Sequence, residues 1–425
     1  MVYIYSILLI IFSVISLPFL FVKGKLHRGI LYRFCITKNI LKDVITKKII
    51  WVHGVSVGEI SLSKPIIEVI REQYPASQLI FSTITKTGNI LAKKYIAKNA
   101  EQVIYFPFDL KGVVKKFLDR IRPSVVMLLE TEIWPNFIYE CHRRNIPVLL
   151  INGRISDGAF KRYMVIQGLL QHVLEKISLF CMQDEISKAK IITLGAPQER
   201  VAVVGNIKFD VTLDEQYVPE KLVILKEYLR ARSRKFFIAG STHPKEEEKL
   251  ISVFKKIRQE YPRLFFLIAP RHIERSHNIL KEVIRYGFKG SLYSSLGRAL
   301  KEDEDVLILD VIGELRYLYG LADVVFIGGS LVPHGGQNLI EPAVFGKPIL
   351  VGPYMDNFKD VTKIFLDSDA VIQVKDEDGL YKALLKLLHN PQIMETVGRN
   401  AKEVVSRNRG IAMRLMNFIK PYVEL

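Results

Sequence analysis

The sequence predicts an α/β protein with two doubly wound domains, each built on a parallel sheet, and an apolar segment in front of them. Three observations predict this fold class. The chain has 425 residues, which is enough for two domains of ordinary size. Short runs rich in Val, Ile and Leu alternate with amphipathic segments, a pattern typical of parallel strands covered by helices on both faces. The alternation pauses at the polar stretch Lys208–Glu220 and then begins again, so the architecture occurs twice.

Composition excludes several other classes of protein. With 49% hydrophobic and 25% charged residues the chain is not largely disordered, and 26 glycines and 18 prolines are too few for a collagen-like or low-complexity protein. The three cysteines, Cys35, Cys141 and Cys181, form no C-x-x-C pair. They cannot build a disulfide framework or a four-thiolate zinc site, so we expect the body of the protein in a reducing compartment.

Positive charge is concentrated in the first half of the chain. The protein has 61 Lys and Arg against 44 Asp and Glu, a net charge of +17. Residues 1–210 carry 29 of the basic and 16 of the acidic residues, whereas residues 211–425 carry 32 and 28. This basic first half suits an anionic partner, which could be nucleic acid, an anionic membrane or a phosphorylated substrate. The alternative is generic basicity without a specific partner.

The first element is the uncharged segment Met1–Val22, which we interpret as a membrane anchor. As a helix it would be about 33 Å long, which matches the hydrocarbon core of a bilayer. A signal peptide fits less well, because the basic residues Lys23, Lys25 and Arg28 follow the segment and no small-residue cleavage site is evident. Under the positive-inside rule these cations keep the rest of the chain in the cytoplasm. A buried core helix is the alternative.

The first α/β domain is predicted over residues 23–210. Its strand candidates cover residues 49–55, 78–84, 102–106, 124–130, 146–152, 179–182 and 201–205. Helices are expected between them, for example over Ser61–Gln73 and Lys111–Ile121, where apolar residues recur every three or four positions.

The second α/β domain is predicted over residues 211–405. Its strand candidates cover residues 235–241, 264–270, 306–310, 323–329, 348–352 and 370–374. Helices are expected over Lys245–Tyr261 and Gly379–His389, among others. Residues 406–425 are predicted to form a C-terminal helix that packs back on the first domain. The two domains are expected to face a cleft, with ligands beyond the carboxyl ends of the strands.

Carboxylates follow two strands of the first domain. Glu59 opens a helix after the turn that begins at His53, and Glu130 ends a strand in LLETEIWPN, with Glu132 two residues on. Such a carboxylate can act as a general base in the cleft. The alternative for each is structural, because the helix dipole favours a carboxylate in the first helical turn.

Three loops of the second domain follow strands and carry groups suited to anions. Gly240–Pro244 offers the amides of a helix start, and Arg271, after Pro270, offers a guanidinium for a phosphate or carboxylate. The loop Gly328–Pro342 predicts a backbone phosphate cradle, with Glu341 placed to reach ribose hydroxyls. A flexible glycine loop is the alternative.

Several familiar motifs are absent from the sequence. It has no G-x-G-x-x-G after a strand and no G-x-x-x-x-G-K-[ST], which argues against a nicotinamide dinucleotide site and a P-loop. The histidines show no H-E-x-x-H spacing, and we interpret the pair Asp367 and Asp369 as a solvated turn, so no metal site is predicted.

Taken together, the segments HGVSVGE, LLETEIWPN, INGRISD, GNIKFD, GSTHPKEEE, APRH and GGSLVPHGGQNLIEP resemble the 3-deoxy-D-manno-octulosonic acid (Kdo) transferase family. The resemblance implies two Rossmann-like domains of the glycosyltransferase-B type facing a cleft, with an N-terminal transmembrane helix. It also implies transfer of Kdo from CMP-Kdo to the lipid A precursor (lipid IVA) in lipopolysaccharide biosynthesis, on the cytoplasmic side of a bacterial inner membrane. An anionic lipid acceptor would account for the basic first domain.

The resemblance also assigns roles to individual residues. It implies Glu59 as the general base, and Glu130 and Lys208 as groups that stabilise charge in the transition state. The residues implied to hold the CMP part of the donor are Pro270, Arg271, Ile312, Gly313, Glu314, Asn338, Leu339, Ile340 and Glu341. No metal or further cofactor is implied, because the sugar arrives with a monophosphate leaving group. A base on one face of the sugar and the leaving group on the other imply inversion.

Three other functions remain as alternatives. A soluble nucleotide-sugar 2-epimerase of related fold would act on UDP-N-acetylglucosamine and would need neither lipid nor anchor. A non-enzymatic module would bind anionic lipid and release no CMP. Nucleic-acid binding would require a known module or aromatic side chains interleaved with basic ones, and the sequence has neither.

Overall fold

The computed structural model describes Tyr5, Leu9 and residues 28–35, 48–55, 57–211, 219–297 and 304–424, with the backbone alone for Arg28, Val57, Gly58 and Ser61. The chain divides into two compact units. Unit 1 comprises Met1–Asp210 and Gly410–Leu425, and unit 2 comprises Val211–Arg409. Each unit contains one parallel sheet, so the prediction of two parallel-sheet α/β domains is confirmed.

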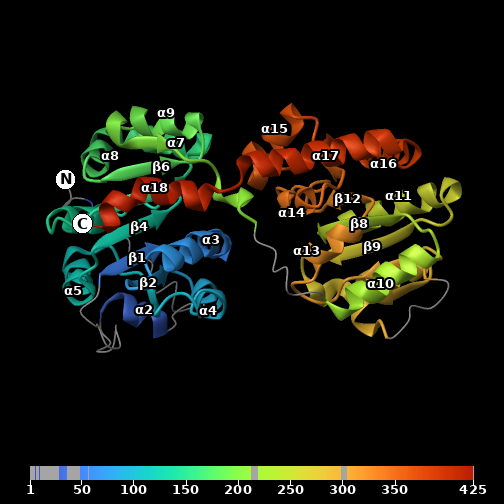
Figure 1. Ribbon diagram of the computed structural model, residues 1–425, viewed down its shortest axis with the longest axis horizontal. Coiled ribbons are helices and arrows are strands. Elements are labelled where there is room, and N and C mark those ends of the chain that lie inside the picture. Colours follow the sequence, from blue (N-terminus) through green and yellow to red (C-terminus); the bar gives the residue numbers. More distant parts are fainter. Residues whose placement is uncertain are drawn as a thin grey trace. The chain divides into compact units, whose positions relative to one another are not determined.

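The sheet of unit 1 has seven strands within the described residues, in the order β3-β2-β1-β4-β5-β6-β7, and all neighbours are parallel (Figure 1). The strands are β1 (Ile49–His53), β2 (Gln78–Thr83), β3 (Gln102–Tyr105), β4 (Val125–Leu129), β5 (Val148–Gly153), β6 (Leu179–Met182) and β7 (Val201–Val203). The helices are α2 (Arg28–Arg33), α3 (Val57–Gln73), α4 (Lys86–Tyr95), α5 (Lys111–Ile121), α6 (Pro135–His142), α7 (Asp157–Val165), α8 (Gln167–Leu174), α9 (Glu185–Thr193) and α18 (Ile411–Val423). The strand order reverses between β1 and β4, which is where open sheets of this kind bind ligands.

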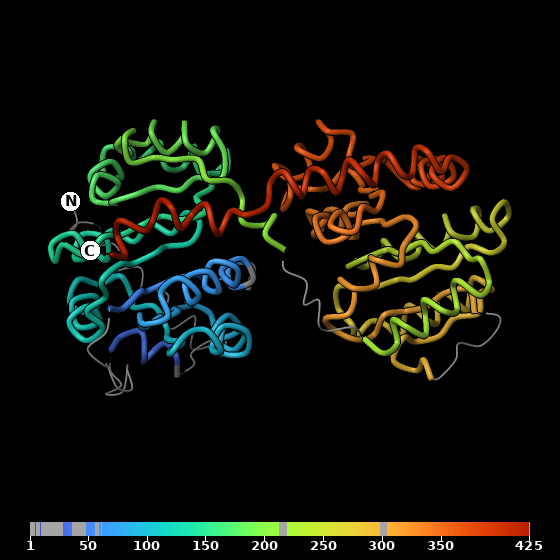
Figure 2. The backbone as a smooth tube through the Cα atoms, viewed as in Figure 1, coloured from blue at the N-terminus to red at the C-terminus, as the bar shows by residue number. Residues whose placement is uncertain are grey.

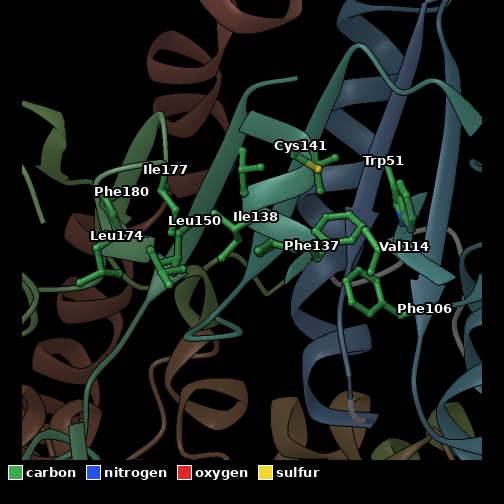
Figure 3. Packing of buried hydrophobic residues seen from close by; sticks show 14 of the residues in the cluster. Trp51, Phe106, Val114, Phe137, Ile138, Cys141, Leu150, Leu174, Ile177 and Phe180 are labelled. Carbon is green, nitrogen blue, oxygen red and sulfur yellow. The ribbon is translucent and has the colours of Figure 1, made fainter. Parts of the chain in front are cut away.

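The central strands of unit 1 are buried along their whole length because helices cover both faces of the sheet. One face packs around aromatic rings, with Trp51 and Phe137 in edge contact at 5.2 Å between ring centroids (Figure 3). The other face packs against α3 and α18. This two-sided burial explains why the strands appear in the sequence as continuous apolar runs.

Helix α18 belongs to unit 1 although it ends the chain (Figures 1 and 2). Its side chains Leu415 and Ile419 are buried in the same cluster as those of α3. The Asp210 carboxylate caps its start by accepting hydrogen bonds from the backbone N–H groups of Gly410 (2.8 Å), Ile411 (3.1 Å) and Ala412 (2.7 Å). The last residue of the segment GNIKFD therefore has a structural role.

The sheet of unit 2 also has seven parallel strands within the described residues, in the order β10-β11-β9-β8-β12-β13-β14. The strands are β8 (Phe236–Thr242), β9 (Phe265–Pro270), β10 (Gly290–Leu292), β11 (Val306–Ile308), β12 (Val324–Ile327), β13 (Ile349–Val351) and β14 (Ile372–Gln373). The helices are α10 (Glu220–Ala231), α11 (Glu246–Glu260), α12 (Ser276–Arg285), α13 (Leu315–Leu318), α14 (Ile340–Val344), α15 (Lys359–Asp367), α16 (Glu377–His389) and α17 (Pro391–Asn408). Strand β10 is not predicted from the sequence, because its three residues Gly-Ser-Leu include a single apolar side chain.

Most of the predicted anchor over residues 1–22 lies outside the described residues. No helix among the residues that the structure describes is long and apolar enough to cross a membrane. Within the segment, Tyr5 is partly buried, and its hydroxyl donates a hydrogen bond to the carboxylate of Asp109. Asp109 is itself buried in unit 1 and accepts the backbone N–H of Phe137 at 2.7 Å.

Candidate active site

Glu59 lies at the carboxyl end of β1, in the first turn of α3. Its side chain folds back over the strand-to-helix turn, where its Oε2 accepts the backbone N–H of Val55, and it is 8% exposed. Gly54 makes room for this arrangement. A Cβ atom on Gly54 would lie 3.3 Å from both the Cβ of Glu59 and the Cδ1 of Leu129, the last residue of β4. The Cβ end of the Glu59 side chain is therefore next to the end of β4, at the point where the strand order reverses.

Glu130 and Glu132 follow β4 directly. Glu130 has a left-handed backbone (φ 56°) and donates its N–H to the carbonyl of Ile151 at 2.9 Å. Burial raises the pKa of Glu132 to about 7, and the negative charges of Glu59 and Glu130 raise it further in the same direction. The three carboxyl groups are thus close enough to interact electrostatically. In the sequence Glu132 stands out only as a neighbour of Glu130, because a spacing of two residues does not show which carboxyl retains its proton.

Lys208 lies at the same carboxyl edge, in a short 3-10 helix (Ile207–Phe209) that follows β7. The backbone N–H of Ile207 donates to the Oδ1 of Asn152, near the end of β5, at 3.1 Å. The Lys208 side chain is partly buried. The structure therefore places the three catalytic residues implied by the resemblance on one edge of one sheet, because β5 is the neighbour of β4.

Unit 2 brings Asn338, Glu341 and Arg271 into one electrostatic group. The Asn338 amide donates to Glu341 Oε1 at 3.3 Å, while its Oδ1 accepts the backbone N–H of Ile340 at 3.0 Å. Burial raises the pKa of Glu341, and Arg316, Asn338 and Arg271 act in the opposite direction. Leu339 and Ile340 are fully buried, so these two residues can offer a ligand only their backbone.

The remaining donor residues implied by the resemblance lie on the two loops beside this group. Arg271 follows Pro270 at the end of β9 and is exposed, with its backbone N–H bound to the carbonyl of Thr242. The loop after the neighbouring strand β11 carries Ile312, which is 80% exposed, and Gly313, whose φ of 96° favours glycine. Glu314 ends the loop and accepts a hydrogen bond from the Tyr293 hydroxyl at 2.6 Å.

The predicted phosphate cradle in Gly328–Pro342 is wrong for its first part. The backbone N–H groups that would hold a phosphate already bind the buried carboxylate of Glu246, at 2.7 Å from Gly329, 3.1 Å from Ser330 and 2.9 Å from Leu331. An internal anion thus satisfies these donors, and they cannot also bind a ligand. The sequence could not reveal this, because Glu246 lies on a distant segment, at the start of α11, where it resembles any acidic residue in a first helical turn.

The described residues support neither a metal site nor a ligand site in a hollow of unit 2. Among the residues that the structure describes, no group of three or more His, Cys, Asp or Glu could hold a metal ion. A hollow of about 800 Å³ at the opposite, amino edge of the unit 2 sheet is lined by several arginines. Two of them are already engaged, Arg234 with backbone carbonyls and Arg258 with Asp305, so the hollow has a structural explanation.

Comparison with known proteins identifies the family. Residues 29–211 match the family model described as 3-deoxy-D-manno-octulosonic-acid transferase (kdotransferase). A 3-deoxy-D-manno-octulosonic acid transferase from Haemophilus influenzae is 33% identical over 376 residues, which cover 88% of this chain and 87% of the relative. A bifunctional glycosyltransferase/methyltransferase from Fusobacterium nucleatum is 34% identical over 400 residues, 93% of this chain but only 60% of that longer protein.

Solved structures show the same fold at much lower identity. UDP-GlcNAc 2-epimerase from Neisseria meningitidis, bound to UDP-GlcNAc, aligns with a TM-score of 0.59 over 87% of this chain and the whole of that chain, at 15% identity. At this identity the similarity concerns architecture alone, two parallel-sheet α/β domains as in glycosyltransferase-B proteins. The 33% identity to a transferase along almost the full length is the stronger relationship, and the chain therefore belongs to the 3-deoxy-D-manno-octulosonic acid (Kdo) transferase family.

Proposed function

We propose that this chain transfers Kdo from CMP-Kdo to a hydroxyl group of a phosphorylated lipid A precursor, with inversion and without a metal. The observation that carries the proposal is the group of carboxyls at the reversal of strand order in unit 1. Glu59 is the general base. It takes the proton of the acceptor hydroxyl as the hydroxyl oxygen bonds to the anomeric carbon, while the bond from that carbon to phosphate breaks and CMP leaves with the electron pair.

The other carboxyls support this role of Glu59. Because Glu132 has a pKa near 7, it retains a proton for part of the time at neutral pH, and the group then carries one negative charge less. Glu59 can stay ionised next to Glu130 under these conditions. Positive charge that develops on the sugar is stabilised by the remaining carboxylate, and Lys208 on the same edge offsets negative charge on the leaving group.

An exposed basic and apolar surface next to the carboxyls supports a lipid acceptor. Burial raises the pKa of Tyr163, on α7, and the charge of Glu132 also raises it, which places α7 beside the carboxyl group. The same helix exposes Lys161 and Arg162. Val165, at its end, is 85% exposed. Cations for phosphate and an exposed aliphatic side chain for acyl chains suit an anionic lipid.

We also propose that residues 1–22 anchor the protein in the inner membrane, with the catalytic units on the cytoplasmic side. A bilayer span would separate Tyr5 from Asp109, so the anchored state requires that their hydrogen bond be open. Membranes from cells producing the full chain should retain it after alkaline carbonate extraction, and a protease added outside spheroplasts should leave both units intact. Release of the full chain by carbonate would contradict the anchor while leaving the transfer reaction in place.

The transfer reaction is tested with the purified full chain, tetraacylated lipid A precursor in detergent and CMP-Kdo generated in the same tube. Mass spectrometry should show the lipid heavier by one or more Kdo increments, with one CMP released for each. Intact CMP-Kdo in the presence of acceptor would contradict the proposal. A parallel reaction with UDP-N-acetylglucosamine and no lipid tests the epimerase alternative, for which the epimer should form.

A further inference from the structure

Three histidine rings converge at the carboxyl edge of the unit 2 sheet. His243 follows β8, His272 follows β9, and His334 lies in the loop after β12. The rings of His243 and His334 are stacked, with centroids 4.3 Å apart and planes 19° apart. The ring of His272 meets that of His243 edge-on at 6.3 Å. None of these residues has a role in the transfer reaction as described so far.

The central ring, His243, is fixed by its surroundings. Its side chain is almost buried, and the Gln337 amide nitrogen lies 3.1 Å from its Nε2. Because an amide nitrogen can only donate, Nε2 accepts this hydrogen bond and the ring proton lies on Nδ1. Gly329 packs against the ring, since a Cβ there would lie 3.0 Å from the His243 Cδ2. Nδ1 has no hydrogen-bond partner within the described parts of the chain, so its N–H is available to a ligand.

The electrostatic surroundings of His243 favour an anion. Burial lowers the pKa of His243 to about 4, and the neighbouring His334, His272, Arg271 and Arg275 lower it further in the same direction. Arg275 is already paired with Glu247, at 2.7 Å. Arg271 has no ion pair within the residues described, and its charge acts on Glu341 as well as on His243. Arg271 is therefore close enough to interact electrostatically with both the histidines and the Asn338–Glu341 group.

We propose that the histidine cluster, His243 with His272 and His334, binds the carboxylate of the donor sugar. The inference rests on the proposed function. A CMP-linked keto acid carries its carboxylate on the same carbon that bears the phosphate oxygen, so the two anionic groups are neighbours. With the nucleoside held at Asn338–Glu341 and the phosphate at Arg271, the carboxylate falls on the histidine side and receives the Nδ1–H of His243. The cluster then selects sugar nucleotides that carry a carboxylate.

CMP lacks the carboxylate, and this separates a direct role of the histidines from a merely structural one. We would measure the KM for CMP-Kdo in the transfer assay and the Kd for CMP by calorimetry, for the wild type and for H243L, H243N, H272A and H334A. H243L should raise the KM for CMP-Kdo by about tenfold or more, the usual effect of losing a hydrogen bond to a charged group, and leave the Kd for CMP within about twofold. H243N should recover much of the affinity, because its amide places an N–H where Nδ1 stood. H277A, which changes an exposed histidine of α12, is the matched control and should alter neither constant.

Equal changes in the KM for CMP-Kdo and the Kd for CMP would overturn the inference, because the histidines would then only shape the loop. Unchanged donor KM values in H243L and H334A would overturn it too. H334A and H272A alter exposed side chains, so they keep the test decisive if H243L fails to fold. The wild-type measurements separate the two proposals. If the wild type transfers Kdo and the histidine variants are unaffected, only the proposed carboxylate subsite is overturned. If the wild type does not consume CMP-Kdo, the proposed function and the subsite are both overturned.

Discussion

Glu246 accepts a hydrogen bond from the backbone N–H of Leu331 at 2.9 Å, and so ties the start of α11 to the glycine loop after β12. The same carboxylate binds the N–H groups of Gly329 and Ser330, and it is fully buried. The loop that carries His334 and leads to Asn338 is therefore fixed by a charged side chain of the protein before any ligand arrives. The geometry of the proposed donor-binding edge depends on this contact.

Replacing Glu246 by Gln should destabilise unit 2. The amide would turn one N–H group toward backbone donors and remove the negative charge that binds them, so we expect a loss of about 2–4 kcal/mol in the free energy of unfolding. Denaturant unfolding followed by circular dichroism measures this loss. Glu248→Gln changes an exposed acid in the same helical turn and should have little effect; equal losses in both variants would contradict the role of Glu246.

Glu59→Gln should abolish most of the transfer activity. Removing the proposed general base is expected to lower kcat by about 10²- to 10⁴-fold, with a smaller effect on the KM for the donor, which is proposed to bind to unit 2. The control is Glu68→Gln, which replaces another glutamate of α3 whose carboxylate pairs with Lys64 at the surface. Glu59 would not be the base if the Glu59→Gln enzyme kept kcat within a few fold of the wild type.

Glu132→Gln should stabilise the protein at high pH and not at low pH. The pKa of Glu132 is raised from 4.5 to about 7 in the folded protein, so the folded state binds more protons than the unfolded state between these values. The free energy of unfolding of the wild type therefore falls as pH rises through this window. Since Glu132 is partly exposed, we expect the variant to be more stable by about 1–2 kcal/mol at pH 8 and equal to the wild type near pH 4. Thermal unfolding at the two pH values measures the difference, and a difference independent of pH would show that Glu132 titrates normally.

Asp210→Ala should release the start of α18. The variant loses three hydrogen bonds to helix N–H groups, so we expect a loss of about 1–2 kcal/mol and faster hydrogen exchange at residues 411–414. The comparison is Asp376→Ala, which removes the single capping bond to Gly379 at the start of α16. Exchange at 411–414 that is equally slow in the wild type and in Asp210→Ala would mean that packing alone holds the helix.

Much of the fold could be predicted from the sequence because burial on both faces makes the strands continuous apolar runs. Every strand candidate corresponds to a strand of the structure, with ends that differ by a few residues at most. Strand β10 could not be predicted, because it is held by pairing with β11 rather than by its own side chains. Glu59 and Glu130 could be singled out as candidates because residues that follow parallel strands share one edge of the sheet.

The rest of the site depends on contacts between distant segments. The binding of Glu246 to Leu331 joins residues 85 positions apart, and no local pattern marks either as a partner of the other. The histidine cluster combines single residues from three loops, each of which resembles an ordinary loop histidine. The raised pKa of Glu132 arises from the burial and the charges around it, which a sequence spacing does not give.

The return of α18 has a consequence for the order in which the protein can fold during synthesis. Asp210 and Ala412 are 202 positions apart, so the ribosome must make the whole of Val211–Arg409 before the Asp210 cap can form. At about 5–20 residues per second this delay is roughly 10–40 s. Unit 2 is a continuous stretch and is complete at that moment, whereas the buried face that α18 covers is still open on the nascent chain. Unit 1, whose synthesis begins first, therefore completes its folding last. A chaperone has its longest opportunity to bind at the α3 face of unit 1.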